Sequence, residues 1–226
     1  MSQGLLFALI VVAVVLAFAL SAYFYYQREA GFAHVATSLG LSFSERDTSS
    51  VRGLDFPLFH QGSGTESGNL VSGTLQGTAV AAFDFAYWTE TRDAKGITHR
   101  QYHRFLCAVT DLSASCGRLS IEHRGLLGQV AGALGLDGVQ FESDAFDRAY
   151  RVTCDDRRFA TALVDPAMIA WLLDAPRPVM FQTAGTHLLA AAEDRRPEAI
   201  PGLLHTLLDF RAHMPAFVAR EYPVGR

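Results

Sequence analysis

Residues 5–26 read LLFALIVVAVVLAFALSAYFYY, a stretch of 22 residues that contains no charge. An α-helix of this length rises about 33 Å, which matches the hydrocarbon core of a bilayer. Its last four residues, Tyr23 to Tyr26, are aromatic, and amphipathic rings favour the headgroup layer. The charged Arg28 and Glu29 follow directly. The stretch from Leu5 to Tyr26 therefore predicts a transmembrane helix, with residues 1–28 as a membrane anchor.

A cleaved signal peptide is the alternative interpretation of the same stretch. Ala17 to Ala19 and Leu20 to Ala22 place small residues where a signal peptidase cuts. However, the first four residues, MSQG, carry no basic side chain, and the apolar stretch is longer than the core of a signal peptide. We expect the anchor to remain uncleaved.

The basic residues around this helix predict its orientation. No Lys or Arg precedes the apolar stretch, whereas Arg28 follows it and Arg46 and Arg52 come later. Basic residues are enriched on the cytoplasmic side of membrane helices. This bias favours a single-pass protein of the inner (plasma) membrane with a cytoplasmic globular domain, and leaves an envelope-facing domain as the alternative.

The three cysteines agree with a reducing compartment. Their number is odd and they show no CxxC spacing, so at least one thiol stays unpaired in a monomer. We expect all three to be small buried hydrophobic residues. They are Cys107, Cys116 and Cys154.

Composition excludes several classes of protein. Half of the 226 residues are hydrophobic and only 19% are charged, which excludes a disordered chain, and three cysteines are too few for a disulfide scaffold. With 19 basic and 23 acidic residues, the net charge of −4 provides no broad positive field. We therefore expect no nucleic-acid partner.

Residues 29–50 connect the anchor to the rest of the chain. Apolar residues from Phe32 to Leu39 recur at helical spacing before Gly40, so the transmembrane helix is expected to run on or to kink into a juxtamembrane helix. The polar residues 44–50 then form a connector. Residues 51–226 are expected to form one globular domain, because no long Pro- or Ser-rich linker interrupts them.

The first half of this domain has the pattern of short strands. In residues 78–90, Phe83, Phe85 and Tyr87 alternate with small residues and Asp84, so two faces of a strand are distinguished. Residues 97–109 read as the returning strand of a hairpin. Other strands are expected at 54–59, 69–76 and 119–123, while Gly125 to Leu136 fits either a short helix or a loop.

The second half carries clearer helix signals. Asp155 or Asp156 can cap a helix that starts near Arg157, and Asp165 precedes a proline at a first helical position. The remaining expected elements are a strand at 146–154, a hairpin formed by 179–183 and 187–191, and a final helix from Pro197 or Pro201. The order lacks regular βαβ alternation, which predicts an α+β fold: an N-terminal transmembrane helix followed by a mostly antiparallel sheet with packed helices.

Two motifs give the sequence a resemblance. Phe-Asp-Phe at 83–85 and Phe-x-Arg-x-Tyr-x-Val at 146–152 occur in this order, with the Asp165-Pro166 helix start after them. With these motifs, the chain resembles a family of uncharacterised bacterial membrane-anchored proteins, notably actinobacterial ones, that carry a domain of unknown function. The resemblance covers roughly residues 30–220. It implies a location and an architecture, and it brings no catalytic residues.

Asp84 and His103 are the candidate catalytic pair. If the loop at 91–96 sets the register of the hairpin so that Asp84 faces His103, a carboxylate would orient an imidazole as in a general-base arrangement. No nucleophile signature accompanies the pair, and His99 and His103 lie four residues, or about 13 Å, apart on one strand, too far to share a metal ion. A structural pair or two surface imidazoles explains these residues better.

On the final helix, His205, Asp209 and His213 recur every four residues. This spacing would align them for a divalent cation, but it also describes the polar face of a helix whose Leu204, Leu207 and Leu208 pack inward. We interpret the three residues as a polar face. No catalytic, cofactor-binding or metal-binding residue is therefore predicted.

The sequence predicts a non-enzymatic, membrane-tethered protein that binds a protein or lipid partner at the inner membrane. The alternative is a membrane-bound hydrolase that works through Asp84 and His103. The two differ in one geometric requirement, because the hydrolase needs these side chains within hydrogen-bond reach beside an open cleft.

Overall fold

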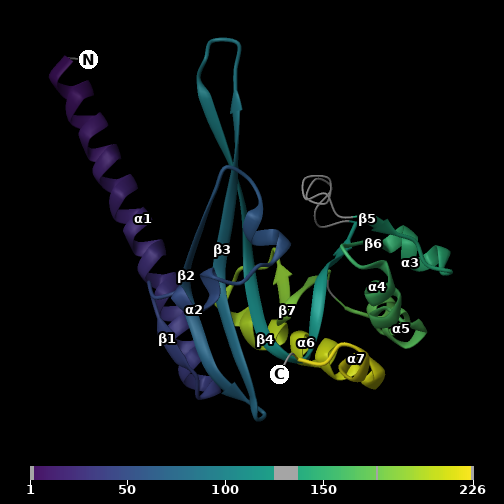
Figure 1. The fold of residues 1–226 in the computed structure, drawn as a ribbon. Coiled ribbons are helices and arrows are strands. Elements are labelled where there is room, and N and C mark those ends of the chain that lie inside the picture. The colour runs from purple at the N-terminus through teal and green to yellow at the C-terminus, as the bar shows by residue number, and fades with distance from the viewer. Residues whose placement is uncertain (1–2, 125–136, 177, 225–226) are drawn as a thin grey trace.

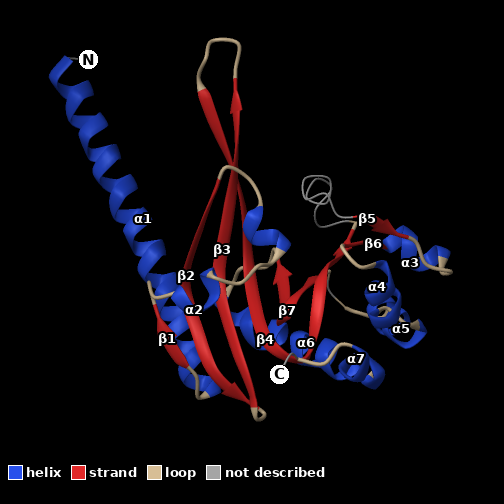
Figure 2. Cartoon of the chain, viewed as in Figure 1, coloured by secondary structure: helices blue, strands red, loops and turns tan. Residues whose placement is uncertain are grey.

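The structure is a computed structural model that describes residues 3–124, 137–176 and 178–224. A long N-terminal helix leads into a seven-stranded antiparallel sheet with shorter helices packed on it (Figures 1 and 2). The predicted α+β class is confirmed. The sheet order is β1-β2-β3-β4-β6-β5, and β7 pairs with β4 off this path.

The helical elements include two short 3₁₀ turns, η1 and η2. In chain order they are α1 (Gln3–Leu39), α2 (Ser49–Arg52), η1 (Pro57–His60), α3 (Asp144–Ala149), α4 (Arg157–Leu163), α5 (Pro166–Leu173), η2 (Pro197–Ala199), α6 (Ile200–His213) and α7 (Ala216–Glu221). The strands are β1 (Ser42–Ser44), β2 (Gly64–Leu75), β3 (Thr78–Arg92), β4 (Thr98–His123), β5 (Asp137–Val139), β6 (Tyr150–Cys154) and β7 (Met180–Ala192).

Helix α1 is one continuous helix that lies in two environments. Its N-terminal part exposes apolar and aromatic side chains as far as Tyr26; Phe18, for example, is 74% exposed. Within the described residues, α1 is the helix long and apolar enough to cross a membrane. Its C-terminal part is different, because Phe32 and Ala36 are buried against the sheet. The same helix is thus a candidate membrane anchor and a part of the hydrophobic core.

The alternation predicted for β3 separates two apolar clusters. Phe83, Phe85 and Tyr87 belong to a smaller cluster on one face of the sheet, which η1 covers with Leu58. Val80 and Ala82 belong to the larger cluster on the other face. The large cluster also receives the buried part of α1 and the helices of the second half of the chain.

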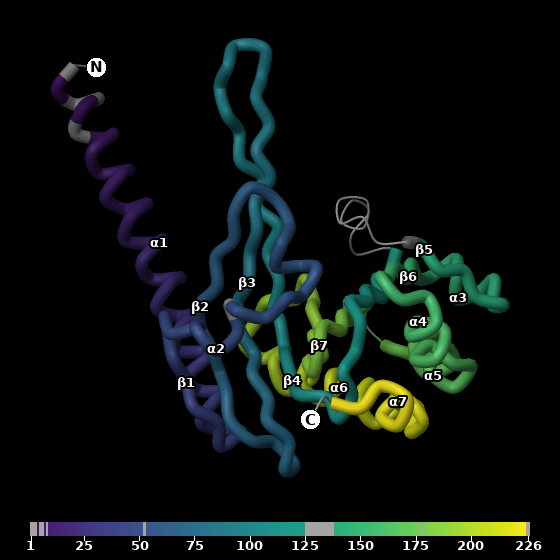
Figure 3. The backbone as a smooth tube through the Cα atoms, in the orientation of Figure 1, coloured from purple at the N-terminus to yellow at the C-terminus, as the bar shows by residue number. Residues whose placement is uncertain are grey.

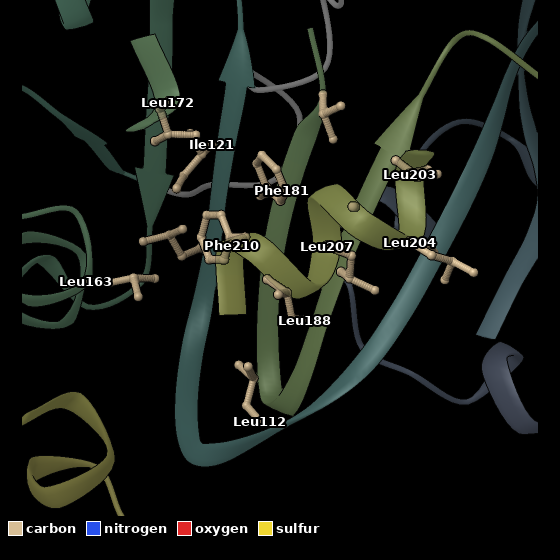
Figure 4. Packing of buried hydrophobic residues seen from close by; sticks show 14 of the residues in the cluster. Leu112, Ile121, Leu163, Leu172, Phe181, Leu188, Leu203, Leu204, Leu207 and Phe210 are labelled. Carbon is tan, nitrogen blue, oxygen red and sulfur yellow. The ribbon is translucent and has the colours of Figure 1, made fainter. Parts of the chain in front are cut away.

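Helix α6 supplies much of the packing on the large face. Figure 4 shows Leu204, Leu207 and Phe210 of α6 turned toward β4 and β7. The rings of Phe210 and Phe181 stack with their centroids 4.4 Å apart. The predicted final helix is therefore present, and it begins at Ile200 after the turn η2.

Strand β4 is longer than the sequence pattern indicated. The two strands expected at 97–109 and 119–123 are parts of one strand of 26 residues. It pairs with β3 through its first half, with β6 near its end, and with β7 along both parts. Register shifts between Asp111 and Leu119 let the long strand bend without ending.

Strand β7 corrects the expected hairpin over residues 184–186. The chain does not reverse there, and residues 180–192 form one strand that pairs with β4 on both sides of Gly185. Gly185 has a φ of +56°, a conformation that glycine adopts without strain. It lies opposite Cys116, at a register shift rather than in a turn. A glycine between two apolar runs indicated a turn, but here it accommodates a bend.

Two other expectations about the strands were wrong. Residues 144–149 form α3, because the Ser143 side chain accepts a hydrogen bond from the Phe146 amide and caps a helix. Only 150–154 of the expected strand is extended. Residues 57–60 form η1 with Pro57 in its first turn. Gly125 to Leu136 lies outside the described residues.

The helix caps read from the sequence are confirmed. The Asp156 side chain accepts hydrogen bonds from the Arg158 and Phe159 amides at the start of α4. Asp165 accepts one from the Met168 amide, 2.8 Å away, and Pro166 follows as the first residue of α5. Short acceptor side chains satisfy amides that have no partner within the first helical turn.

The β3–β4 hairpin projects beyond the rest of the sheet as an arm, residues 89–101. The pairing of β2 with β3 ends at Trp88, and β7 pairs with β4 only from Leu106 onward. Most side chains of the arm are polar and exposed. In Figure 1 the arm and the exposed part of α1 both extend toward the top of the view, with α1 slanting away from the arm to the upper left.

A buried polar network lies on the face of the smaller cluster. The Gln182 amide nitrogen donates to the Ser120 hydroxyl, which donates to Glu122, while the Gln182 carbonyl oxygen accepts from the Leu58 amide. Glu122 is only 4% exposed. Burial raises its pKa, and the hydrogen bond from Ser120 and the charge of Arg151 oppose this shift only in part.

The raised pKa of Glu122 predicts a pH dependence of stability. In the interval between its unfolded and folded pKa values the folded chain binds more protons, so the free energy of unfolding falls as pH rises through that interval. Glu122→Gln should remove this dependence. We expect it to raise the melting temperature at neutral pH relative to the unmodified protein, and to leave it nearly unchanged below the ordinary glutamate pKa. Thermal unfolding of the full chain in micelles at several pH values measures this. An equal effect at all pH values would contradict the prediction.

Candidate functional site

The junction between α1 and the sheet is held by an ion pair. The Arg28 guanidinium donates from Nε to Asp84 Oδ2 at 2.8 Å and from Nη2 to Asp84 Oδ1 at 2.5 Å. Both side chains are mostly buried, with 25% and 19% exposed. The same Nη2 also donates to the Arg195 carbonyl oxygen at 2.6 Å. Arg28 thus joins the helix, β3 and the segment after β7.

An irregularity in β2 completes this junction. The register of β2 shifts between Gly68 and Val71, and Asn69 there has a φ of +52°. The side-chain nitrogen Nδ2 of Asn69 donates a hydrogen bond to Asp84 Oδ2 at 3.0 Å. Asp84 therefore accepts from two side chains that are far apart in the sequence. It lies on the same face of β3 as Ala82, toward the larger cluster.

Close backbone approach also fixes α1. A Cβ at Gly31 would come within 2.8 Å of the Pro197 ring, so the helix can approach η2 only because residue 31 has no side chain. The Arg28 guanidinium lies over the Phe32 ring, 5.3 Å from its centroid. The junction therefore combines an ion pair with direct packing.

The hydrolase alternative required Asp84 to face His103, and this pairing does not form. Asp84 lies opposite Leu106, and His103 lies opposite Tyr87, on whose ring it stacks with centroids 4.6 Å apart. The observed register differs by three residues from the one that would place His103 opposite Asp84. Arg92 and Thr98 form the last pair before the loop, and this pair sets the register of the whole hairpin. Asp84 is engaged by Arg28 instead. Nothing in this geometry supports a hydrolase.

The other candidate histidines, His99, His205 and His213, each contact a neighbouring side chain. His99 lies 3.2 Å from Asp93 near the tip of the arm. On α6, His205 and Asp209 form an ion-pair contact of 2.9 Å, whereas the His213 ring stacks on Trp171. Across the part of the chain that the structure describes, no three metal-ligating side chains converge.

The three cysteines are buried, as expected, and none of them is in a disulfide. Burial raises the pKa of the Cys107 thiol, and it raises that of Cys116 to about 12. Neither thiol is poised as a nucleophile, because the reactive thiolate is disfavoured.

A cleft of about 720 Å³ lies between α5, α6 and the end of β7. Its apolar wall comes from four different elements of the fold. It includes Leu106 of β4, Trp171 of α5, Val179, Ala192 of β7 and Leu203 of α6. This volume falls within the range of about 300–1,000 Å³ that is typical of small-molecule sites.

The residues that line the rest of this cleft are strongly acidic. The carboxylates are Asp174, Glu193, Asp194, Glu198 and Asp209. Two of them have a basic partner, since Asp194 pairs with Arg196 and Asp209 contacts His205. Carboxylates repel phosphate groups and accept hydrogen bonds from hydroxyl groups. The cleft thus combines an apolar wall with a hydrogen-bond-accepting rim.

Sequence reasoning did not identify this cleft. His205 and Asp209 were singled out for their four-residue spacing, and both line it. The spacing indicated a polar face on α6, but it did not indicate that this face borders an apolar cleft. Trp171 and Val179 come from other elements, and only the folded sheet brings them to α6.

Fold and junction together define a class: an α+β protein whose antiparallel sheet is built directly onto an apolar helix of membrane-spanning length. No family model and no curated protein matches the sequence. Among solved structures, the chain is similar to the mycobacterial trehalose monomycolate transport factor A, TtfA, with a TM-score of 0.61 and 14% identity. The match covers 88% of this chain and 98% of that chain.

At this identity the similarity shows a shared fold. The match extends over nearly the whole of both chains, so it includes the sheet and its helices together rather than a fragment. The mycobacterial origin of the neighbour is consistent with the resemblance to actinobacterial proteins.

The Arg28–Asp84 pair makes a prediction for stability. Asp84→Asn or Arg28→Gln should each lower the free energy of unfolding by about 1–3 kcal/mol, because each leaves a mostly buried charged group without its partner. The free energy of unfolding of the double variant should fall by less than the sum of the two single decreases. Tryptophan fluorescence of the full chain in micelles, followed through urea unfolding, measures these values.

Arg46→Gln is the matched control, because Arg46 makes an exposed contact with Glu45. It should change the unfolding free energy by less than about 0.5 kcal/mol. Strict additivity of the two junction substitutions would show that they do not interact.

Proposed function

We propose that this chain is a non-enzymatic protein, tethered to the inner membrane by α1, that binds an amphipathic lipid in the cleft between α5 and α6. The observation that carries this proposal is the apolar cleft of about 720 Å³ with its acidic rim, on a domain joined rigidly to a helix of membrane-spanning length. An amphipathic ligand suits such a site, because its chain contacts the apolar wall while its headgroup meets the polar rim.

The rim favours a particular kind of headgroup. Five carboxylates disfavour a phosphate or another anion, and accept hydrogen bonds from sugar hydroxyls. Trp171 adds an aromatic surface to the wall. The solved structure with a similar fold is a transport factor for trehalose monomycolate, a lipid whose headgroup is an uncharged disaccharide. We therefore infer a glycolipid as the ligand class.

The domain is inferred to face the cytoplasm. Arg28 follows the apolar stretch after Gln27, in agreement with the positive-inside bias. The three cysteines are not disulfide-bonded, which is compatible with a reducing compartment.

We name the cleft between α5, α6 and the end of β7 the lipid cleft; Gly202→Leu should block it. Gly202 lines it, and a Cβ there meets no atom within 4 Å, so a larger side chain can extend into the hollow without a clash. Leucine also favours a helix over glycine, so stability should not fall. We expect binding of a pyrene-labelled trehalose monoester by the full chain in nanodiscs to weaken about tenfold or more. Pyrene fluorescence measures it.

Ala212→Leu is the matched control on the same helix, at an exposed position that does not line the cleft. It should leave binding unchanged. Unlabelled phosphatidylglycerol tests the headgroup and should not displace the labelled trehalose monoester. Equal binding by both variants would place the ligand elsewhere, and displacement of the trehalose monoester by phosphatidylglycerol would exclude the proposed role of the rim.

Ala212→Cys tests the orientation. Ala212 is exposed on α6, on the body of the domain, while the native thiols are buried, so the new cysteine should dominate labelling. In intact spheroplasts a membrane-impermeant maleimide should fail to label it until the membrane is permeabilised. Gly4→Cys, at the other end of the apolar stretch, should show the opposite pattern. Labelling of Ala212→Cys in intact spheroplasts would place the domain in the envelope.

A further inference from the structure

A second cleft, of about 480 Å³, lies at the junction between α1 and the sheet. Its walls come from α1, the segment after β1, β2, β3, the start of β4 and the segment after β7. Tyr25 and Arg28 contribute from α1, at the end of the apolar stretch. We name it the junction cleft; it shares no lining residue with the lipid cleft.

The junction cleft is lined by four arginines and three carboxylates. Most of these charges already have partners within the described structure. Asp84 accepts from Arg28, while Glu45 accepts from the Tyr25 hydroxyl at 2.5 Å and from Arg46 at 3.2 Å. These contacts account for two arginines and two carboxylates.

Arg104 and Arg195 are the two arginines that remain. Among the described residues, no carboxylate forms an ion pair with either guanidinium. Arg104 lies over the Tyr102 ring, 4.8 Å from its centroid, and is otherwise exposed. Arg195 is half-buried.

Arg195 is a partly buried cation close to two other arginines and two carboxylates. Burial and the nearby charges of Arg28 and Arg104 lower its pKa, and the opposing influence of Asp84 and Glu66 is smaller. Glu66 is exposed, so solvent screens its charge. An anion held between Arg104 and Arg195 would relieve this unfavourable arrangement of positive charges.

We propose that the junction cleft binds the phosphate of an anionic phospholipid headgroup. A guanidinium presents planar, forked donors that match phosphate oxygens, and it binds them more strongly than a neutral donor does. Tyr25 belongs to the aromatic end of the apolar stretch, which favours the headgroup layer. The cleft therefore opens at the depth where lipid phosphates lie, and it would orient the domain on the bilayer.

Lipid selectivity of the full chain tests the proposal. The protein is reconstituted in phosphatidylcholine vesicles with a trace of spin-labelled phosphatidylglycerol or spin-labelled phosphatidylcholine. Electron paramagnetic resonance then gives the fraction of each label that is motionally restricted. We expect a several-fold preference for phosphatidylglycerol, and Arg195→Gln should abolish most of it.

Arg196→Gln is the matched control, because Arg196 neighbours Arg195 in sequence but is exposed and paired with Asp194. It should leave the preference intact. Arg195→Lys keeps the positive charge but loses the forked donors of the guanidinium. It should therefore retain part of the preference for phosphatidylglycerol. Melting temperatures of all variants must agree, and the Arg195 backbone contact with Arg28 does not depend on its side chain.

Free phosphate is the other source of the same chemistry. Inorganic phosphate is titrated into the protein in micelles, with and without Arg195→Gln. Weak binding that phosphatidylglycerol displaces agrees with a headgroup site. Phosphate binding without any lipid preference would overturn the proposal in favour of a soluble ligand. Equal restriction of both lipids, or a preference that survives Arg195→Gln, would also overturn it, while the lipid cleft would be unaffected.

Discussion

The bidentate pair of Arg28 and Asp84 is the constraint on which the arrangement of this protein depends. It lies where α1 changes environment, four residues before Phe32 enters the core and two residues after the apolar stretch ends. A cation at this position would ordinarily extend into the headgroups. Here it is satisfied by a carboxylate of β3, so the membrane helix and the sheet behave as one body. Tilting the helix therefore tilts the sheet.

This rigidity has a consequence for the arm. Arg28 and Asp84 are in contact, so the length of α1 beyond Arg28 can be compared with the length of β3 beyond Asp84. Helix α1 rises about 35 Å from Arg28 to Leu5. Strand β3 rises about 30 Å from Asp84 to Asp93. Figure 3 shows both extending toward the top of the view, with α1 slanting away from the arm. Polar residues such as Asp93 and Lys95 are not tolerated in hydrocarbon. In a bilayer the arm must therefore lie against polar protein, or α1 and the sheet must tilt together until the arm leaves the hydrocarbon.

Local signals in the sequence were reliable where one residue type has one physical role. The caps at Asp156 and Asp165 and the apolar stretch before Tyr26 are such cases. The errors at Gly185 and at Asp84 have another origin. A glycine serves a turn or a bulge equally well, and a hairpin register depends on which residues close the loop. The lipid cleft and the junction cleft were not predictable, since each joins side chains from several elements that only the sheet brings together.

The segment from Ala192 to Ala199 relates the two clefts to the membrane helix. Glu193 and Asp194 line the lipid cleft, and the next residue, Arg195, lines the junction cleft. Two residues later, Pro197 packs against Gly31 of α1. The acidic rim of one cleft and an arginine of the other are thus separated by a single peptide step, and the acidic rim disfavours the phosphate that suits the junction cleft. Since α1 contacts this segment directly, any displacement of the helix relative to the sheet changes the walls of both clefts together.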